Sequence, residues 1–322
     1  MVGSHVVERL VREGWTVRAL VRSPSPMLEE MGAECTTGDV LDDDAFSRAA
    51  GRCDVIFHNA AAITPRGGWE AFRRVNLDGT SNAIEAARAS GARLVHLSSV
   101  AVYGPAARYR ADGLKTDETT PLSPLPERSY YARSKRESEE LVMRAHAAGK
   151  VWATALRPTV IYGTRDRQFV PRMARMLSRG IAPLIGGGTS KFSLVHAANV
   201  ADGVVRAAAS DVAGGRAYNV ANDFDVTVRR LFELAGEGLG RRIRFVHLPT
   251  PVAAGALRAI KAITRALFGG RMSVVSSATL LWLTRDNPFT SDRARAELGW
   301  TPTVRPETGI PEAFRWWAEH SR

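Results

Sequence analysis

Cysteine is nearly absent from this sequence, which contains only Cys35 and Cys53 among 322 residues. Two cysteines cannot build the disulfide framework of a small secreted domain, so a reducing compartment is expected. The histidines are scattered singly, and without Cys/His clustering at zinc-ligand spacing we expect no metal. At 45% hydrophobic and 24% charged residues, the composition excludes general disorder and is typical of a globular protein.

Acidic residues are missing between Glu237 and Asp286, and lysine is scarce throughout, with five lysines among 44 basic residues. The formal net charge is +11, and most of this excess lies in the acid-free stretch. Its basic residues are Arg241, Arg242, Arg244, Arg258, Lys261, Arg265, Arg271 and Arg285. The positive charge is therefore local rather than global.

Long apolar runs are also missing, since the uncharged run 272–284 is shorter than the ~20 residues that span a bilayer. The start of the chain lacks the pattern of a signal peptide, so we expect a cytoplasmic protein.

Within 252–284, apolar residues recur at helical spacing beside basic ones. We favour a helix that covers a pocket, and keep a peripheral membrane contact as the alternative. No aromatic platform accompanies the arginines, so we expect no nucleic-acid partner.

Short β-rich runs alternate with helical patterns from the start to about residue 160. The expected strands are 16–21, 55–58, 94–97 and 151–156, and the expected helices are 5–12, 43–50, 69–89 and 133–148. This alternation predicts an α/β fold with a Rossmann-type, doubly wound parallel sheet. We assign 1–160, with 195–222 contributing, to this domain. Residues 161–322 are expected to form mostly a smaller α/β substrate domain.

The segment that carries most chemical information is Tyr131-Ala-Arg-Ser-Lys135. Residues four apart on a helix share a face, so the ammonium group is expected to lower the pKa of the phenol. Tyr131 would then serve as a general acid or base for a hydroxyl or carbonyl. Upstream, Ser98 and Ser99 end an expected strand, and one of these hydroxyls can hold the reacting oxygen. We favour Ser99, with Ser98 as the alternative.

These residues and several further motifs, in this order, resemble the extended short-chain dehydrogenases/reductases along nearly the whole chain. The resemblance implies catalytic roles for Ser99, Tyr131 and Lys135, and it implies that Tyr131 and Lys135 also contact the cofactor. The further motifs are Gly3, Gly38-Asp39-Val40, His58-Asn59-Ala60-Ala61, Asn76, Arg157-Pro158 and Leu298-Gly299-Trp300-Thr301-Pro302. Among these, Gly3, Asp39, Val40, Asn59, Ala60, Ala61, Asn76 and Pro158 are the implied cofactor contacts. Structural alternatives are helix packing at Gly3, a helix cap at Asp39, loop support at Asn59 and an architectural role at Asn76.

The chain departs from the family pattern at its beginning. Met1-Val2-Gly3 falls inside the glycine-rich turn, so the first strand and two earlier glycines are missing from the sequence. That strand is central in the classical strand order. We expect a start roughly a dozen residues upstream.

The cofactor and the substrate class follow from single positions. Arg22 lies at the end of the second strand, where an acidic residue would favour NAD, and an arginine suits the 2′-phosphate of NADP. We therefore expect NADP, with NAD as the alternative. Ala198-Asn199-Val200-Ala201 resembles the 3β-hydroxysteroid dehydrogenase-like group, and Phe192 occupies the position where sugar-nucleotide enzymes carry an arginine.

The resemblance thus implies an oxidoreductase acting on a secondary alcohol or ketone of an apolar substrate, such as a steroid, terpenoid or 3-keto acid. A nucleotide-sugar epimerase or dehydratase is the alternative within the superfamily. A non-catalytic dinucleotide-binding protein is the alternative from another class. A homodimer is kept open.

Overall fold

The computed structural model describes residues 1–63, 67–108, 112–221, 224–253, 255, 259 and 285–321. The chain divides into two compact units. Unit 1 comprises 1–159, 197–221 and 289–303, and unit 2 comprises 160–196, 222–288 and 304–322. The segment 289–303, assigned above to the substrate part, thus lies in unit 1.

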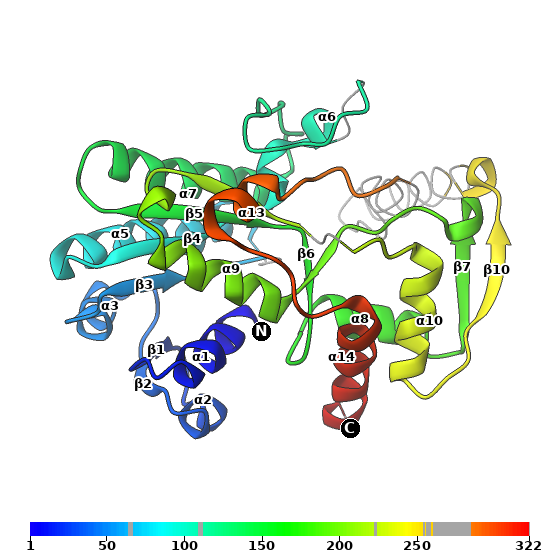
Figure 1. Cartoon of the computed structure of the whole chain (residues 1–322), viewed down its shortest axis with the longest axis horizontal. Helices are drawn as coiled ribbons and strands as arrows, with labels where there is room; N and C mark the ends of the chain where they lie inside the picture. The colour runs from blue at the N-terminus through cyan, green and yellow to red at the C-terminus, as the bar shows by residue number, and fades with distance from the viewer. Residues whose placement is uncertain are drawn as a thin grey trace. The chain divides into compact units, whose positions relative to one another are not determined.

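A parallel sheet of four strands forms the centre of unit 1, in the order β3-β4-β5-β9 (Figure 1). The strands are β3 (Val55–His58), β4 (Arg93–Leu97), β5 (Ala153–Pro158) and β9 (Ala217–Val220). Every residue of β5 is buried, as expected for a parallel strand that is covered on both faces. The predicted α/β fold with parallel sheets is confirmed.

A second, two-stranded parallel sheet in unit 1 pairs β1 (Arg18–Val21) with β2 (Glu34–Thr37). In the described residues, no strand bridges β1 and β3. The two sheets are separated at the place where the family pattern has its first strand.

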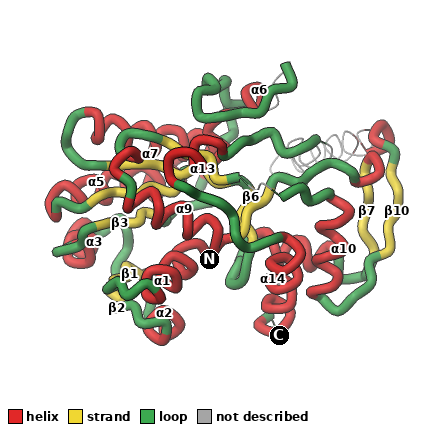
Figure 2. The backbone as a smooth tube through the Cα atoms, viewed as in Figure 1, coloured by secondary structure: helices red, strands yellow, loops and turns green. Residues whose placement is uncertain are grey.

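Helices lie on both sides of the four-stranded sheet (Figure 2). On one side, α3 (Asp43–Ala50), α5 (Gly79–Ser90) and α7 (Tyr130–Ala147) share a core with Ile56 and Leu94. On the other side, α9 (Ala197–Ala209) packs on β4 and β5, and α1 (Val2–Arg12) packs on α9. An Arg9–Asp202 ion pair of 2.9 Å joins these two helices. The arrangement is the doubly wound one.

The predicted helix 69–89 is divided into three parts. These are α4 (Gly68–Arg73), the π-helix η1 (Arg74–Asp78) and α5. Short π-helices are rare and often mark functional positions, and η1 contains Asn76. The smaller elements of unit 1 are α2 (Pro26–Glu30), η2 (Val100–Tyr103), α6 (Pro105–Arg108), η4 (Asp211–Ala213) and α13 (Asp292–Leu298).

The described residues of unit 2 form two parallel strand pairs and three longer helices. β6 (Val160–Tyr162) pairs with β8 (Leu194–His196), and β7 (Ile181–Ile185) pairs with β10 (Arg244–Leu248). Its core gathers Leu184, Phe232 and Phe314, among others. The helices are α8 (Phe169–Met176), α10 (Val228–Gly238) and α14 (Pro306–His320), and three consecutive glycines form the short 3₁₀ turn η3 (Gly186–Gly188).

Glycine permits the close approach of two of these helices. A side chain at Gly238 of α10 would place its Cβ 2.4 Å from the carbonyl oxygen of Pro311 in α14. Much of the expected helical segment 252–284 lies outside the described residues.

Candidate active site

Ser99 and Tyr131 meet at the carboxyl end of β4. Tyr131 is the second residue of α7, and Ser99 is the N-cap residue of η2. The Ser99 side chain accepts a hydrogen bond of 3.2 Å from the backbone N–H of Ala101, and it lies near enough to Tyr131 to lower the pKa of the phenol. Ser98 is buried, and its hydroxyl has no partner among the described residues. The geometry therefore favours Ser99 over Ser98 as the serine that acts with Tyr131.

The electrostatics of Tyr131 differ from the sequence-based expectation. Burial raises the pKa of Tyr131, and the hydrogen bond from Ser99 opposes that shift only in part. The predicted lowering of the Tyr131 pKa by Lys135 is therefore wrong. Lys135 Nζ instead donates a 2.7 Å hydrogen bond to the carbonyl oxygen of Leu97. Burial lowers the pKa of Lys135 to about 8, and the negative charge of Glu139 opposes the shift.

Two buried histidines lie beneath Lys135. His58 and His96 are opposite one another on β3 and β4, and their rings stack with centroids 5.6 Å apart. Burial and the charge of Lys135 lower the pKa of His58 to about 3, and they lower the pKa of His96 strongly. Both rings are therefore neutral at physiological pH, which avoids further positive charge beside the lysine.

Hydroxyl groups on the neighbouring helices orient both histidine rings. Thr80 Oγ1 donates to the carbonyl oxygen of Asn76 at 2.6 Å and lies 3.1 Å from His58 Nε2. A hydroxyl that donates elsewhere must accept here, so His58 carries its proton on Nε2. The same reasoning applies to Ser138, which donates to the Lys135 carbonyl oxygen and lies 3.3 Å from His96 Nε2.

Asn76 connects the loop after β3 to the catalytic helix. Its side chain accepts from the backbone N–H of Ala62 at 2.7 Å and donates to the carbonyl oxygen of Ala62 at 3.0 Å. It also donates to Ser134 Oγ at 2.8 Å. Asn76 is buried, so this arrangement supports the architectural alternative for it. Ser134, between Tyr131 and Lys135, is a contributor that the sequence reasoning missed.

A buried ion pair braces α7 against β5. The guanidinium of Arg157 donates through Nε to both carboxylate oxygens of Glu139, at 3.0 and 3.1 Å, and through Nη1 to Tyr103 Oη at 2.9 Å. The Tyr103 hydroxyl in turn donates to Asn219 of β9 at 2.8 Å. Glu139 lies one helical turn after Lys135, but its partner Arg157 is 18 residues away along the chain, so helical spacing does not indicate this brace.

A second brace involves Arg136 of α7. Its guanidinium donates to the carbonyl oxygens of Val102 and Ser123, at 2.9 Å from Nε and 2.8 Å from Nη2 respectively. Ser123 itself donates through N and Oγ to the carbonyl oxygen of Tyr103, at 2.8 and 3.0 Å. Arg136 thus ties the turn that follows Ser99 to the helix that carries Tyr131, together with the proline-rich loop between Gly104 and α7, which contains Pro105, Pro121, Pro124 and Pro126.

The residues expected to contact a dinucleotide lie at the loops of unit 1. A Cβ at Gly3, in the first turn of α1, would lie 3.8 Å from Asn59 Nδ2, and the buried Asn59 Oδ1 has no partner in the described residues. Ala60 and Ala61 follow in the loop that Asn76 holds. Pro158 ends β5 and is buried. An orphaned acceptor beside a helix N-terminus fits a cofactor with hydroxyl or amide donors.

Three further predicted contacts follow the strands of the two-stranded sheet of unit 1, Arg22 after β1 and Asp39 and Val40 after β2. Arg22 follows β1, is exposed and has no ion-pair partner in the described residues. Asp39 Oδ1 accepts from the backbone N–H of Leu41 at 3.0 Å, whereas α3 is capped by Asp42. The alternative that Asp39 is a helix cap is therefore wrong. Val40 accepts from Asn82 Nδ2 at 2.9 Å, which fixes this loop against α5.

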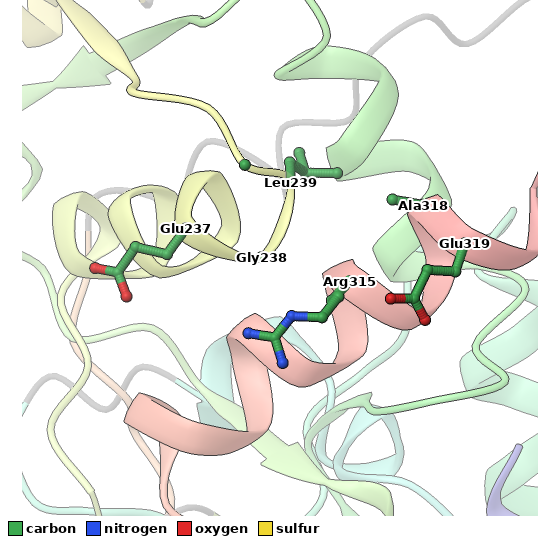
Figure 3. A pocket seen from close by; sticks show the side chains of 7 residues that line it. Glu237, Gly238, Leu239, Arg315, Ala318 and Glu319 are labelled. Carbon is green, nitrogen blue, oxygen red and sulfur yellow. The ribbon is translucent and has the colours of Figure 1, made fainter.

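A hollow of about 520 Å³ lies in unit 2 between the C-terminal end of α10 and α14 (Figure 3). It is lined by charged groups such as Glu237, Arg315 and Glu319 and by none of the predicted site residues. Its lining offers no chemistry that matches Ser99, Tyr131 and Lys135.

Within the described ranges, no three His, Cys, Asp or Glu residues gather as a metal site, and none of the described helices could cross a bilayer.

Comparisons with known proteins identify the family of this chain. The model of the NAD dependent epimerase/dehydratase family matches residues 1–221. A ketoreductase from Stigmatella aurantiaca, named for 4-hydroxy-2-methyl-3-oxo-4-farnesyl-3,4-dihydroquinoline-1-oxide, is 30% identical over 96% of this chain and 91% of its own. The 2-alkyl-3-oxoalkanoate reductase of Stenotrophomonas maltophilia is 30% identical over 96% of this chain and 94% of its own.

Solved structures share the fold. The UDP-glucuronic acid 4-epimerase of Bacillus cereus, in complex with NAD, matches 100% of this chain and 96% of its own with a TM-score of 0.75 at 16% identity. At that identity the likeness concerns the fold alone. Together with the family match, these findings identify an NAD(P)-dependent enzyme type. The chain belongs to the NAD dependent epimerase/dehydratase family, within the extended short-chain dehydrogenases/reductases.

Proposed function

We propose that this protein reduces a ketone, or oxidises the matching secondary alcohol, on an apolar substrate, with NADP(H) as its preferred cofactor. The proximity of the Ser99 side chain to Tyr131, one helical turn from the buried Lys135, carries this proposal. The names of the two curated relatives support the substrate class, since one has a farnesyl group and the other an alkyl chain beside the oxo group.

The residues divide the work between proton transfer and positioning. When bound, the dinucleotide supplies or takes up the hydride at the substrate carbon. Tyr131 donates the proton to the carbonyl oxygen in reduction and receives it in oxidation. Ser99 holds that oxygen by a hydrogen bond. Lys135, fixed by its hydrogen bond to the Leu97 carbonyl oxygen one helical turn from Tyr131, would hold the cofactor beside the phenol. The raised pKa of Tyr131 suits the proton donor of the reductive direction.

The NADP preference rests on Arg22. An exposed guanidinium at the end of β1, with no partner in the described residues, is suited to a charge-assisted hydrogen bond with a 2′-phosphate. Replacement Arg22→Ala should raise the KM for NADPH by about tenfold or more and leave the KM for NADH nearly unchanged, since such a bond is worth ~1.5–3 kcal/mol. Arg12→Ala, another exposed arginine of unit 1, is the control. A wild-type preference for NADH would contradict this assignment.

The epimerase alternative receives less support from the site. Phe192 lies in the core of unit 2, and Lys191 makes a 2.6 Å ion pair with Asp225. Neither arrangement leaves a free cation for a sugar diphosphate at this position. Asn199 is buried, and its Oδ1 accepts from the backbone N–H of Thr303 at 3.0 Å.

A substrate panel tests the proposal. NADPH oxidation is followed with a 2-alkyl-3-oxo acid, a 3-ketosteroid, a farnesylated ketone and UDP-sugars. We expect turnover with at least one apolar ketone and none with the sugars. Epimerisation of a UDP-sugar without net NADPH consumption would overturn the proposal in favour of the alternative.

A further inference from the structure

The N-terminal ends of β7 and β10 bring together arginines that are distant in the sequence. The strands run parallel, with Ile181 opposite Arg244 (Figure 1). The backbone N–H of Arg244 donates to the carbonyl oxygen of Gly180 at 2.8 Å, and the Arg241 guanidinium donates to the carbonyl oxygen of Ser178. These contacts place Arg179 beside Arg241, Arg242 and Arg244. Arg175, in the last turn of α8, precedes them.

No acidic residue balances this charge along the chain. The sequence contains none in 167–201 and none in 238–285, the two stretches that supply β7 and β10. All five arginines are exposed. In the described part of the chain, Arg175, Arg179, Arg242 and Arg244 make no ion pair. The nearby Glu237 is bound to Arg230 at 3.1 Å, and Glu319 lines the same hollow as Arg315.

Exposed aliphatic side chains accompany the arginines. Burial alternates along β7, with Ala182 and Leu184 buried and Ile181 and Pro183 exposed. Ile181 and Val246 are each 50% exposed, and Met176 at the end of α8 is 43% exposed. Parallel strands are ordinarily covered on both faces, so the outer face of this strand pair is unusual. We call the five arginines with Met176, Ile181 and Val246 the basic-apolar face.

We propose that the basic-apolar face binds the surface of an anionic lipid bilayer. Unpaired arginines are attracted to the negative surface potential of such a membrane, and aliphatic side chains between them gain by entering the interface. Single-stranded nucleic acid would need aromatic groups on which bases can stack, and the face offers none. Membrane binding would bring the enzyme to substrates that partition into lipid. The inference stands without the proposed reaction, since its evidence lies in unit 2 alone.

Vesicle flotation with the full chain tests the proposal. The vesicles are phosphatidylcholine alone or phosphatidylcholine with about one third phosphatidylglycerol. The test variant is Arg179→Gln/Arg242→Gln. The matched control is Arg88→Gln/Arg144→Gln, which removes two exposed arginines from helices of unit 1. Thermal unfolding and the turnover of a water-soluble ketone verify that each variant is folded.

We expect binding to the anionic vesicles only, with an affinity that falls as salt is raised. Each arginine near a membrane surface contributes roughly fivefold in affinity, so the test variant should bind about 25-fold more weakly. The control should bind like the wild type. Equal binding to neutral vesicles, an unchanged affinity of the test variant, or binding of duplex DNA in preference to vesicles would overturn the proposal.

Discussion

At Tyr131, burial and hydrogen bonding act on the phenol in opposite directions. The net effect is a raised pKa, although the pattern of a tyrosine four residues before a lysine predicts a lowered one. The reason is that Lys135 bonds to the Leu97 carbonyl oxygen in this structure. A sequence pattern places two side chains on one helix face, but it does not determine which acceptor the ammonium selects.

Replacing Tyr131 by phenylalanine removes the proton donor and keeps the ring. We expect turnover to fall by ~10²–10⁴ while the Kd for NADPH stays within about twofold. Tyr130→Phe is the control, because Tyr130 packs its ring on Trp69 and Phe72 and a phenylalanine retains that packing. Steady-state kinetics and a fluorescence titration provide the two readouts. Unchanged turnover in Tyr131→Phe would remove this residue from the mechanism.

The stacked histidines make an acid-dependent contribution to stability. Their pKa values are lowered in the folded protein, so below about pH 6.5 the unfolded chain binds protons that the folded chain does not. The unfolding free energy should therefore fall as pH decreases, by ~1.4 kcal/mol per pH unit for each histidine.

Denaturant unfolding of wild type and His96→Gln between pH 7 and pH 4 tests this contribution. The difference in unfolding free energy at pH 7 reports the packing that the variant loses. The change in the dependence of the unfolding free energy on pH reports the titration of His96. We expect the unfolding free energy of the variant to fall less steeply with decreasing pH, by the ~1.4 kcal/mol per pH unit that one histidine contributes. Parallel curves would show that His96 becomes protonated without loss of structure.

At the scale of elements, the boundaries of several strands and helices could be predicted because their patterns are local. Strand 55–58 and helix 43–50 coincide with β3 and α3. The division of 69–89 could not be predicted, because η1 forms where Asn76 bonds simultaneously to Ala62 and Ser134. Those partners are 14 and 58 residues away along the chain, beyond the reach of periodicity.

The hydrogen bonds of Arg136 to the carbonyl oxygens of Val102 and Ser123 connect three elements, namely η2, the proline-rich loop and α7. Arg136→Lys keeps the charge and loses the planar fork that reaches two carbonyl oxygens. We expect kcat to fall by roughly 10- to 100-fold through misplacement of Ser99, with the KM for NADPH little changed. Arg133→Lys, three residues earlier on the same helix, should keep the wild-type kcat. An equal loss in both variants would indicate a general effect on the helix.

Gly104, at the start of the proline-rich loop, tests how tightly this loop is held. Its φ is +79°, and a Cβ would lie 2.5 Å from Ser123 Oγ and 2.7 Å from the Ser123 carbonyl oxygen. With ψ at 172°, this backbone conformation is one that essentially only glycine adopts, so Gly104→Ala incurs both a backbone cost of ~1–3 kcal/mol and a collision.

Gly113 is the matched control, because its φ is +72° and nothing lies within 4 Å of its added Cβ. Gly113→Ala should incur the backbone cost alone. Chemical unfolding of both variants separates the two effects. Equal losses of stability would mean that Ser123 moves aside without cost.

For the whole molecule, the order of motifs along the chain predicted the α/β fold, while the residues of the active site stay a prediction. Ser99 and Asn59 follow strands of unit 1, Tyr131 lies at the start of α7, and Asn76 lies within η1. The brace of Glu139, Arg157 and Tyr103 was not foreseen, since its members are far apart in sequence. Arg241, Arg242 and Arg244 were recognised as part of the local positive charge, but only the pairing of β7 with β10 shows that they lie beside Arg179.

The central claim is that Tyr131 and Ser99 serve the reduction of an apolar ketone by NADPH. Hydride transfer is followed directly by using NADPH that carries deuterium at the transferring position of C4. We expect one deuterium at the carbinol carbon of the product alcohol by mass spectrometry, in step with loss of absorbance at 340 nm, and at least 100-fold less in Tyr131→Phe. Product alcohol without deuterium, or equal labelling by Tyr131→Phe, would contradict the account.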